Sequence, residues 1–186
     1  MAGGRDEDNQ SLASVEYYEV SMNVWAAAAQ MTVPRSSCGA AVLGGKLYVA
    51  GGVNGNEVHG SVERYDPSTN SWETTAAMST ARHSHVVVEL EGKLYVAGGF
   101  DTLAGPTLST VERYDPATNA WELVAPMREH RFHFSAAVLG GKLYVAGGRN
   151  DSGHLASVER YDPSTNTWEE VAHMTHGCSD LILCSL

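Results

Sequence analysis

The chain has 186 residues, enough for one ordinary domain, and 43% of them are hydrophobic, which is enough to form a core. Its formal net charge of −10 argues against non-specific nucleic-acid binding, because such binding needs a basic surface. The sequence contains no apolar run of about 18 residues, which excludes a membrane-spanning helix. The N-terminal residues lack the apolar core of a signal peptide, and the three cysteines form no disulfide pattern. We therefore expect a reduced, cytoplasmic setting, with the nucleus as the alternative.

A pattern of nearly fifty residues occurs four times along the sequence. Its most visible members are Trp25, Trp72, Trp121 and Trp168, which are separated by 47, 49 and 47 residues. Four diglycines and four methionines keep nearly the same spacing: Gly3-Gly4, Gly51-Gly52, Gly98-Gly99 and Gly147-Gly148, with Met31, Met78, Met127 and Met174. A period of this length indicates a stacked or radial array of one repeated unit.

One unit, residues 82–127, predicts four short strands. The expected strands cover residues 85–88, 93–97, 110–114 and 121–124. They are rich in Val, Tyr and Trp and are separated by turn residues such as Glu91-Gly92 and Asp115-Pro116. Four strands of this kind, joined by short turns, predict an antiparallel four-stranded sheet.

Neither face of the predicted sheet is polar. In the second strand Leu94 and Val96 face one way, while Tyr95 and Ala97 face the other. Both faces must therefore be covered, as they are when a sheet is stacked between two similar sheets. The first strands at 39–42 and 135–138 consist of small residues, which suit the crowded centre of a radial arrangement. We expect the diglycines to permit close backbone approach or positive φ, and each Trp to reach the next sheet.

The order Gly-Gly, Tyr-Asp-Pro, Asn-x-Trp, Met and Arg at this period closely resembles the kelch repeat of β-propellers. The resemblance covers essentially the whole chain. It is closest to the propellers of BTB–kelch (Kelch-like) proteins, whose repeats share the wording GGKLYVAGG and SVERYDPSTNxW. The resemblance implies an all-β kelch propeller. Because such propellers usually have five to seven blades, the resemblance also implies that this chain forms a partial one.

The repeat pattern divides the chain into five parts. Residues 1–32 are expected to form an N-terminal half-blade (the end of strand 2, with strands 3 and 4). Three complete blades follow at 33–78, 79–127 and 128–174. Residues 175–186 form an off-pattern tail that could begin a further blade, with Cys178 where the repeat predicts Arg. We expect a fragment, a gene-model piece or an alternatively ended product. The alternative is a strained four-blade ring, closed by residues 181–186 beside the N-terminal strands.

The eight histidines raise the question of a metal site. Candidate ligands are His83 with His85, Glu129 and His130 with His133, and His173 and His176 with Cys178. None of these sets has a recognised zinc spacing backed by a second pair, so we expect no metal and no cofactor. The sequence also has no Ser/His/Asp or Cys/His signature, no P-loop and no nucleotide fingerprint. Some kelch propellers are enzymes, but none of their motifs stands out. We therefore predict that the chain is not an enzyme.

The loops of the blades differ on their two sides. Within each blade, the 1–2 and 3–4 turns, including Gly44-Gly45-Lys46 and the Asp-Pro-x-Thr-Asn turns, are nearly identical between repeats, which indicates an architectural role. The 2–3 loops at 53–59, 100–106 and 149–154 vary in length and content. Together with the links between blades, they are expected to form one face, called here the variable face. Six of the nine arginines are expected to reach it.

We predict that the variable face binds a peptide or protein, with acidic motifs favoured because the guanidinium fork suits carboxylates. The alternative for Arg35, Arg82 and Arg131 is that they brace the blades, since they recur at one repeat position. Phe132 is expected nearby. The candidate partner-binding residues are Arg5, Arg35, Ser37, Asn54, His59, Arg82, Ser84, Asp101, Arg128, Arg131, His133, Arg149, Asn150 and Asp151.

Three functions are compatible with the sequence. The first is a protein-interaction module, namely the substrate-recognition domain of an adaptor for cullin-type ubiquitin ligases. The resemblance implies this role, in which the ligase would be reached through a BTB region of the parent protein that this chain does not contain. The second is an actin- or cytoskeleton-binding kelch protein, and the third a kelch-fold enzyme. The sequence does not name the bound protein, the number of blades in the parent or the oligomeric state.

Overall fold

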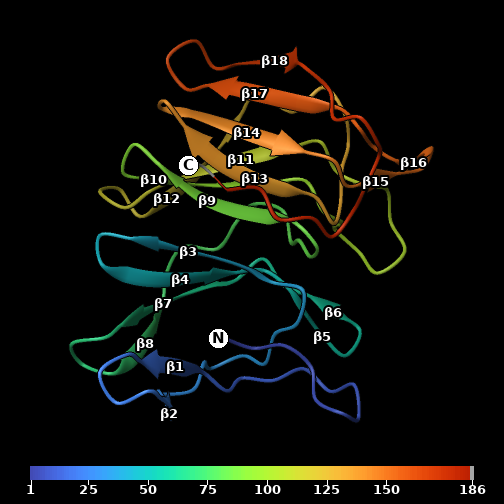
Figure 1. Ribbon diagram of the computed structural model, residues 1–186. Helices are drawn as coiled ribbons and strands as arrows, with labels where there is room; N and C mark the ends of the chain where they lie inside the picture. Colours follow the sequence, from blue (N-terminus) through green and yellow to red (C-terminus); the bar gives the residue numbers. More distant parts are fainter. Residues whose placement is uncertain (185–186) are drawn as a thin grey trace.

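The computed structural model describes residues 1–184, and this part of the chain is all-β, with no helix (Figure 1). Accordingly, these residues contain no helix that could cross a membrane. The strands form three four-stranded antiparallel sheets and three two-stranded hairpins. The predicted fold class, an all-β array of four-stranded antiparallel blades, is confirmed. Residues 185 and 186 of the predicted tail strand lie outside the described part of the chain.

Each four-stranded sheet is one blade, with its strands in sequence order from inside to outside. Blade 1 consists of β3 (Gly39–Leu43), β4 (Lys46–Ala50), β7 (Val62–Asp66) and β8 (Ser71–Thr74). Blade 2 consists of β9 (Val86–Leu90), β10 (Lys93–Ala97), β11 (Val111–Asp115) and β12 (Ala120–Val124). Blade 3 consists of β13 (Ser135–Leu139), β14 (Lys142–Ala146), β17 (Val158–Asp162) and β18 (Thr167–Val171).

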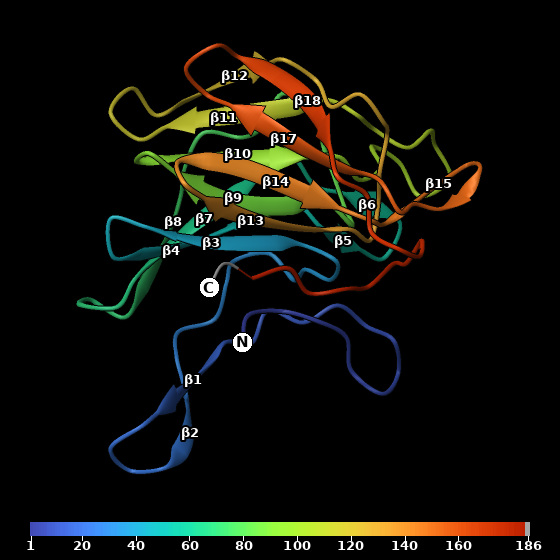
Figure 2. The ribbon, with the colours of Figure 1, turned by 45° about the horizontal axis from the view of Figure 1, so that its top comes forward.

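The three hairpins lie outside these blades. The N-terminal hairpin consists of β1 (Glu16–Glu19) and β2 (Val24–Ala27), which occupy the positions of a third and a fourth strand. The 2–3 loops of blades 1 and 3 contain the other two, formed by β5 (Val53–Asn54) with β6 (Glu57–Val58) and by β15 (Arg149–Asn150) with β16 (Gly153–His154). Figures 1 and 2 show β1–β2 at the end of the stack opposite β17–β18.

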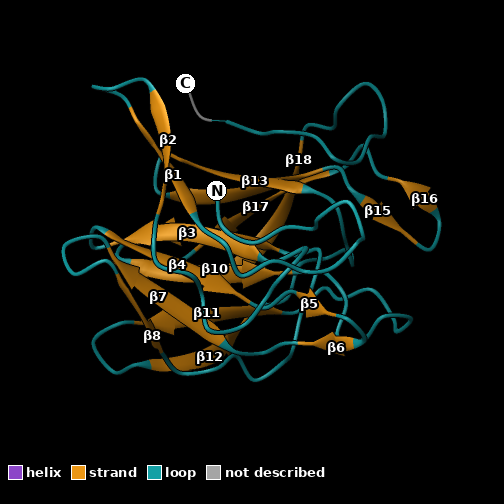
Figure 3. Ribbon diagram, turned by 90° about the horizontal axis from the view of Figure 1, so that it is seen from below, coloured by secondary structure: helices purple, strands orange, loops and turns teal. Residues whose placement is uncertain are grey.

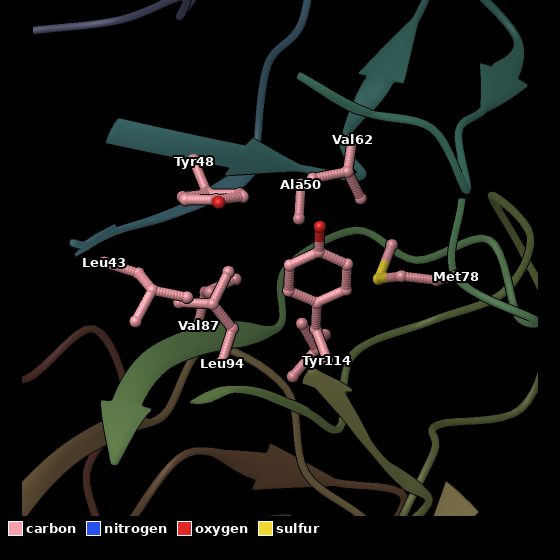
Figure 4. Packing of buried hydrophobic residues seen from close by; sticks show 9 residues of the cluster. Leu43, Tyr48, Ala50, Val62, Met78, Val87, Leu94 and Tyr114 are labelled. Carbon is pink, nitrogen blue, oxygen red and sulfur yellow. The ribbon is translucent and has the colours of Figure 1, made fainter. Parts of the chain in front are cut away.

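The core lies between the blades rather than inside any one of them. Between blades 1 and 2 the core contains Tyr48 from β4 of blade 1, together with Leu94 from β10 and Tyr114 from β11 of blade 2 (Figure 4). The rings of Tyr48 and Tyr114 are 5.8 Å apart, and those of Tyr95 and Tyr161 repeat this contact at 5.7 Å between blades 2 and 3. Aromatic pairs of this kind add about 0.5–1.5 kcal/mol to the free energy of burial. The expectation that both sheet faces are covered is confirmed for blade 2.

Trp25 is exposed, but each of the other three repeated tryptophans reaches the preceding repeat, as predicted. Its indole nitrogen donates to a backbone carbonyl at 2.8–2.9 Å, and the three donor–acceptor pairs are Trp72 with Ala29, Trp121 with Ala76, and Trp168 with Ala125. The amide of the same alanine donates in return to the side-chain oxygen of an asparagine in the turn before the tryptophan, namely Asn70, Asn119 and Asn166. Neighbouring repeats are therefore joined by a reciprocal pair of hydrogen bonds at their outer edge.

The first strands of the blades meet at the centre, where β3 and β13 both contact β9. At the end of each second strand, the first glycine of the diglycine lets the backbone approach the link to the next blade closely. Gly51 has a φ of +65°, and a Cβ atom on it would lie 2.4 Å from the carbonyl oxygen of Arg82. Only glycine fits such a position without strain. The predicted role of the diglycines is confirmed.

A buried arginine joins each link between blades to the blade that follows. The Arg82 guanidinium is completely buried, and it bonds Glu112 Oε1 at 3.1 Å and the Thr110 hydroxyl and carbonyl at 2.9 and 3.0 Å. Glu112 also accepts hydrogen bonds from Ser79 of the same link. Arg35 with Glu63 and Arg131 with Glu159 repeat this arrangement. We call these three pairs the braces.

The braces hold charged groups where water does not reach them. Burial alone would raise the pKa of Glu63, but hydrogen bonds from Thr32 and Arg35 outweigh it and lower the pKa of this carboxyl. Burial lowers the pKa of Arg82, and the charge of Glu112 opposes that effect. Removing one partner leaves the other as an unpaired buried charge, which costs much more than the pair contributes.

We predict that Glu112→Ala lowers the free energy of unfolding by about 3–5 kcal/mol, because it leaves Arg82 buried without a counter-charge. The matched control is Glu122→Ala in the same blade, which breaks the half-exposed Arg113–Glu122 pair and should cost less than about 1 kcal/mol. Urea denaturation followed by circular dichroism measures both values. Equal losses for the two variants would contradict the importance of the brace.

His85 lies at the centre of the molecule, between blades 1 and 2. Burial, aided by the positive charge of Arg82, lowers its pKa to about 3, so the imidazole is neutral in the native state. Its ring packs against Gly51, as the ring of Phe134 packs against Gly98 one repeat later. The site therefore accepts a flat ring but not a charge.

We predict that His85 makes the protein less stable as the pH falls. An unfolded histidine takes up a proton near pH 6.5, whereas native His85 does so only near pH 3. The free energy of unfolding should therefore fall by about 2 kcal/mol between pH 7.5 and pH 5 because of this group alone. The control is His85→Phe, which uses the ring found at the equivalent Phe134. Its chemical-denaturation curves should show a pH slope smaller by that amount, and identical slopes would refute the assignment.

Candidate functional site

The variable loops gather on one side of the molecule. The β5–β6 and β15–β16 hairpins project from the same side of the stack, on the right in Figures 1 and 3. The 2–3 loops follow the C-terminal ends of β4 and β14. The nearly identical β3–β4 and β13–β14 turns lie at the N-terminal ends of the same two strands. The expectation that the 2–3 loops share one face agrees with this arrangement.

Antiparallel bridges hold each 2–3 loop against the link that precedes its blade. The bridges join Ser36 to Val53, His83 to Phe100, and Phe132 to Arg149. Blades 2 and 3 thus each present two side chains next to each other on the variable face, one from the link and one from the loop, whereas Ser36 and Val53 of blade 1 are buried. The two positions recur in all three repeats, yet the residue types differ at both. The backbone arrangement is therefore constant, while the side chains vary.

Four rings from blades 2 and 3 form a continuous group on this face, called here the aromatic cluster (His83, Phe100, Phe132 and His133). His83 stacks on Phe100 with ring centroids 5.3 Å apart, and Phe100 lies 4.5 Å from Phe132. The ring of Phe132 meets that of His133 at 5.2 Å. Blades 2 and 3 therefore share one partly exposed apolar surface on the variable face.

Cationic groups flank the aromatic cluster. The guanidinium of Arg149 lies 5.9 Å from the centroid of Phe132 and is exposed. On the other side, Arg5 donates to Ser36 at 3.1 Å and to Asn9 at 2.7 Å. Burial lowers the pKa of His83, with minor contributions from His133 and Arg5, so this ring is neutral at pH 7. The surface combines flat apolar rings with fixed positive charges at its edges.

The central ends of the links carry three of the predicted residues, Ser37, Ser84 and His133. All three have positive φ, between 51° and 55°, which is uncommon for residues other than glycine. A chain of backbone hydrogen bonds connects them, from the amide of Ser84 to the carbonyl of Ser37 at 2.9 Å and from His133 to Ser84 at 3.3 Å. Together with Cys38, His85 and Phe134 they line a hollow of about 180 Å³.

Arg35, Arg82 and Arg131 do not reach the variable face. Their side chains are completely buried in the braces, so the prediction that they contact a partner is corrected in favour of the bracing alternative. His59 is also buried: burial lowers its pKa, and its backbone carbonyl accepts the amide of Arg82. These four residues are buried beneath the variable face, so their side chains are not available to a ligand bound on it.

The remaining candidates lie around the aromatic cluster or away from it. Asn150 and Asp151 lie in the β15–β16 hairpin beside Arg149, while Asn54 occupies the matching place in β5. Asp101 follows Phe100 and contributes a negative charge near Arg82. Arg128 lines a separate polar hollow of about 230 Å³ with Glu129 and Glu170, so the structure does not bring it to the cluster.

Three residues of the cluster, His83, Phe100 and Phe132, are not among the predicted binding residues, although Phe132 is expected near them. The signal that could have identified them is a comparison of equivalent positions between repeats. His83 and Phe132 occupy the position of Ser36, and Phe100 occupies that of Val53 and Arg149. Aromatic residues that stand where another repeat has a smaller residue, such as Ser36 or Val53, are candidates for recognition, because the fold itself does not need a ring there.

Within residues 1–184, no three His, Cys, Asp or Glu side chains converge on a point where they could hold a metal ion. His83 and His85, which neighbour each other in sequence, differ in surroundings. His83 belongs to the exposed cluster, whereas His85 is buried against blade 1. The other candidate histidines form separate contacts, such as His130 with Asp151 at 3.6 Å and His133 with Asp180 at 3.3 Å.

Comparisons with known proteins agree with this architecture. The Kelch motif matches residues 34–79, 81–128 and 130–175, and repeats of this kind indicate a propeller domain that binds other proteins. No curated protein matches the chain. A solved structure titled "Structure of YjhT" superimposes with a TM-score of 0.78 at 20% identity, covering 96% of this chain and 67% of that one. At this identity the likeness concerns the fold alone. The three motif matches span most of the sequence, and the chain therefore belongs to the kelch-repeat family.

Proposed function

We propose that the aromatic cluster and its flanking arginines bind a peptide or protein segment that carries an acidic residue next to an apolar one. The observation that carries the proposal is the contact of Phe100 with Phe132 at 4.5 Å, with Arg149 beside them. Large rings supply contact area at little cost in conformational entropy, and Arg supplies directed hydrogen bonds to carboxylates.

The rigidity of the face supports this proposal. Each displayed residue sits on a backbone held by bridges to a neighbouring segment, and each link is fastened by a brace below it. A surface that is ordered before binding loses little entropy when a partner docks. A mixed aromatic and guanidinium surface is also the composition enriched at the energetic centres of protein interfaces.

The preference for acidic segments rests on fewer arginines than the sequence implied. With Arg35, Arg82 and Arg131 buried, the exposed positive charges next to the cluster are Arg5 and Arg149. Asp101 and Asp151 lie close by and weaken the field at longer range. The preference should therefore be local, for one carboxylate placed near Arg149, rather than a general attraction to acidic chains.

We further propose that the parent architecture is a substrate-recognition adaptor of a cullin-type ubiquitin ligase. The support is the wording of the repeats, which is most similar to that of BTB–kelch propellers. In this role the variable face selects the target, while a BTB region of the parent reaches the ligase. Capture of a cullin by a protein containing this propeller and a BTB region would test the assignment, and capture of actin instead would favour the cytoskeletal alternative.

We predict that Arg149→Ala weakens binding of peptides with an acidic residue beside an aromatic or aliphatic one by about tenfold, which corresponds to about 1.4 kcal/mol. Phe100→Ala should weaken it at least as much, because it opens the cluster. The measurement is fluorescence anisotropy with the best peptides from an array in which every Asp or Glu is paired with an Asn or Gln version.

The control for this experiment is Lys93→Ala, which removes a positive charge at the opposite ends of the blades, where it pairs with Asp115. It should leave binding unchanged. An array without preference for the acidic version of each peptide, or equal losses for Lys93→Ala and Arg149→Ala, would refute the proposed site.

A further inference from the structure

The hairpins β5–β6 and β15–β16 place an asparagine at the same position, and both lie on the variable face (Figures 1 and 3). Asn54 ends β5 and Asn150 ends β15, each just before a two-residue turn. The residue that follows is Gly55 in blade 1 and Asp151 in blade 3, and Asn54-Gly55 is the only Asn-Gly pair in the 186 residues. The two hairpins can therefore be compared position by position.

The side-chain amide of Asn54 is not held in place, whereas that of Asn150 is. Asn150 Oδ1 accepts the backbone amide of Ser152 at 2.8 Å, a bond from an asparagine to the backbone two residues further on. Within residues 1–184, the carboxamide of Asn54 makes no such hydrogen bond, and the residue is partly exposed. The Asn54 side chain is therefore free to turn toward its own main chain.

The backbone next to Asn54 is open as well. In the part of the chain that the structure describes, the amide nitrogen of Gly55 makes no hydrogen bond to another backbone group. Gly55 is exposed, and a Cβ atom on it would meet nothing within 4 Å. Glycine also reaches backbone conformations that a residue with a Cβ atom avoids. The carboxamide carbon of Asn54 can therefore approach this nitrogen without steric obstruction.

We propose that Asn54 is a site of spontaneous deamidation, in which the Gly55 amide nitrogen attacks Cγ of Asn54. The nitrogen gives its proton to hydroxide, and the bond from Cγ to the side-chain nitrogen breaks. The side-chain nitrogen takes a proton from water and leaves as ammonia, and a five-membered succinimide ring remains. Water then opens the ring at either carbonyl, which yields aspartate or isoaspartate. In total one water is consumed and one ammonia is released, with no oxidation or reduction.

The small size of the β5–β6 hairpin allows the backbone to reach the geometry of attack. Its two strands have two residues each, and a two-stranded hairpin by itself is only marginally stable. Local opening of an exposed turn costs much less free energy than unfolding of the whole domain. The reaction therefore takes place in the folded protein, while blade 1 stays intact.

Deamidation changes the variable face in two ways. It replaces the neutral carboxamide of Asn54 by a carboxylate directly opposite Glu57, and like charges at opposed positions of a strand pair repel each other. In the isoaspartate product the main chain also gains one carbon, so β5 and β6 lose their register. Both changes are irreversible, and neither depends on whether the face binds a peptide. Blade 1 therefore carries a slow chemical change on its displayed hairpin.

The test is incubation of the folded 186-residue chain at pH 8.5 and 37 °C, followed by tryptic peptide mapping with tandem mass spectrometry. Asn54 and Asn150 fall in separate tryptic peptides, residues 47–64 and 150–160. Asn54 should convert at least about tenfold faster than Asn150, because a Cβ atom on the following residue obstructs the attack. Its rate in the folded chain should be within about tenfold of its rate in urea, because the hairpin opens easily.

Exchanging the two residues that follow the asparagines provides matched controls. Gly55→Asp should slow the conversion of Asn54, and Asp151→Gly should make Asn150 reactive, though less so than Asn54 because of its hydrogen bond. Both substitutions lie in exposed turns, and far-ultraviolet circular dichroism verifies that the variants fold. Conversion of Asn54 in urea but not in the folded chain would overturn the proposal, because the hairpin would then protect it. Equal rates for Asn54 and Asn150 in the unmodified chain would overturn it as well.

Discussion

The constraint on which the rest of the structure depends is that each sheet is apolar on both faces. Leu94 and Val96 pack toward blade 1, while Tyr95 and Ala97 pack toward blade 3, so blade 2 is stable only between two neighbours. Full burial of one such side chain contributes about 1.5–3 kcal/mol, and each blade buries several on either side. The stack is therefore cooperative between neighbours, as in other repeat proteins.

Buried arginine–glutamate pairs within this apolar stack fix how neighbouring blades are oriented. Hydrophobic packing alone would let neighbouring blades slide, because it is not directional. The braces remove that freedom, since an arginine fork and its carboxylate satisfy one another in one geometry only. Each brace joins a link, the end of a second strand and a third strand, as Arg82 does with Glu112 and the carbonyl of Gly98. The position of the variable face is set by these buried pairs.

Much of the fold could be predicted from the sequence, because the repeat shows every structural requirement several times. The strand positions, the bridging tryptophans and the role of the diglycines follow from residue type and spacing. The arginines could not be assigned from their own recurrence, since a recurring surface residue gives the same pattern. The missing signal was the recurring glutamate that accompanies them, 28, 30 and 28 residues later at Glu63, Glu112 and Glu159. Two opposite charges that recur in phase indicate a buried pair rather than two surfaces.

The aromatic cluster was harder to predict for a related reason. Contacts between Phe100 and Phe132 depend on two loops of different blades, and no pattern within one repeat reports them. A comparison between the repeats does show which residues every blade needs. A residue such as Tyr114 or Trp121 recurs because every blade needs it, whereas Phe100 stands where the other blades have Val53 and Arg149. Since the scaffold folds with any of the three, the fold does not require a ring at Phe100, and the proposed recognition of a partner would account for it.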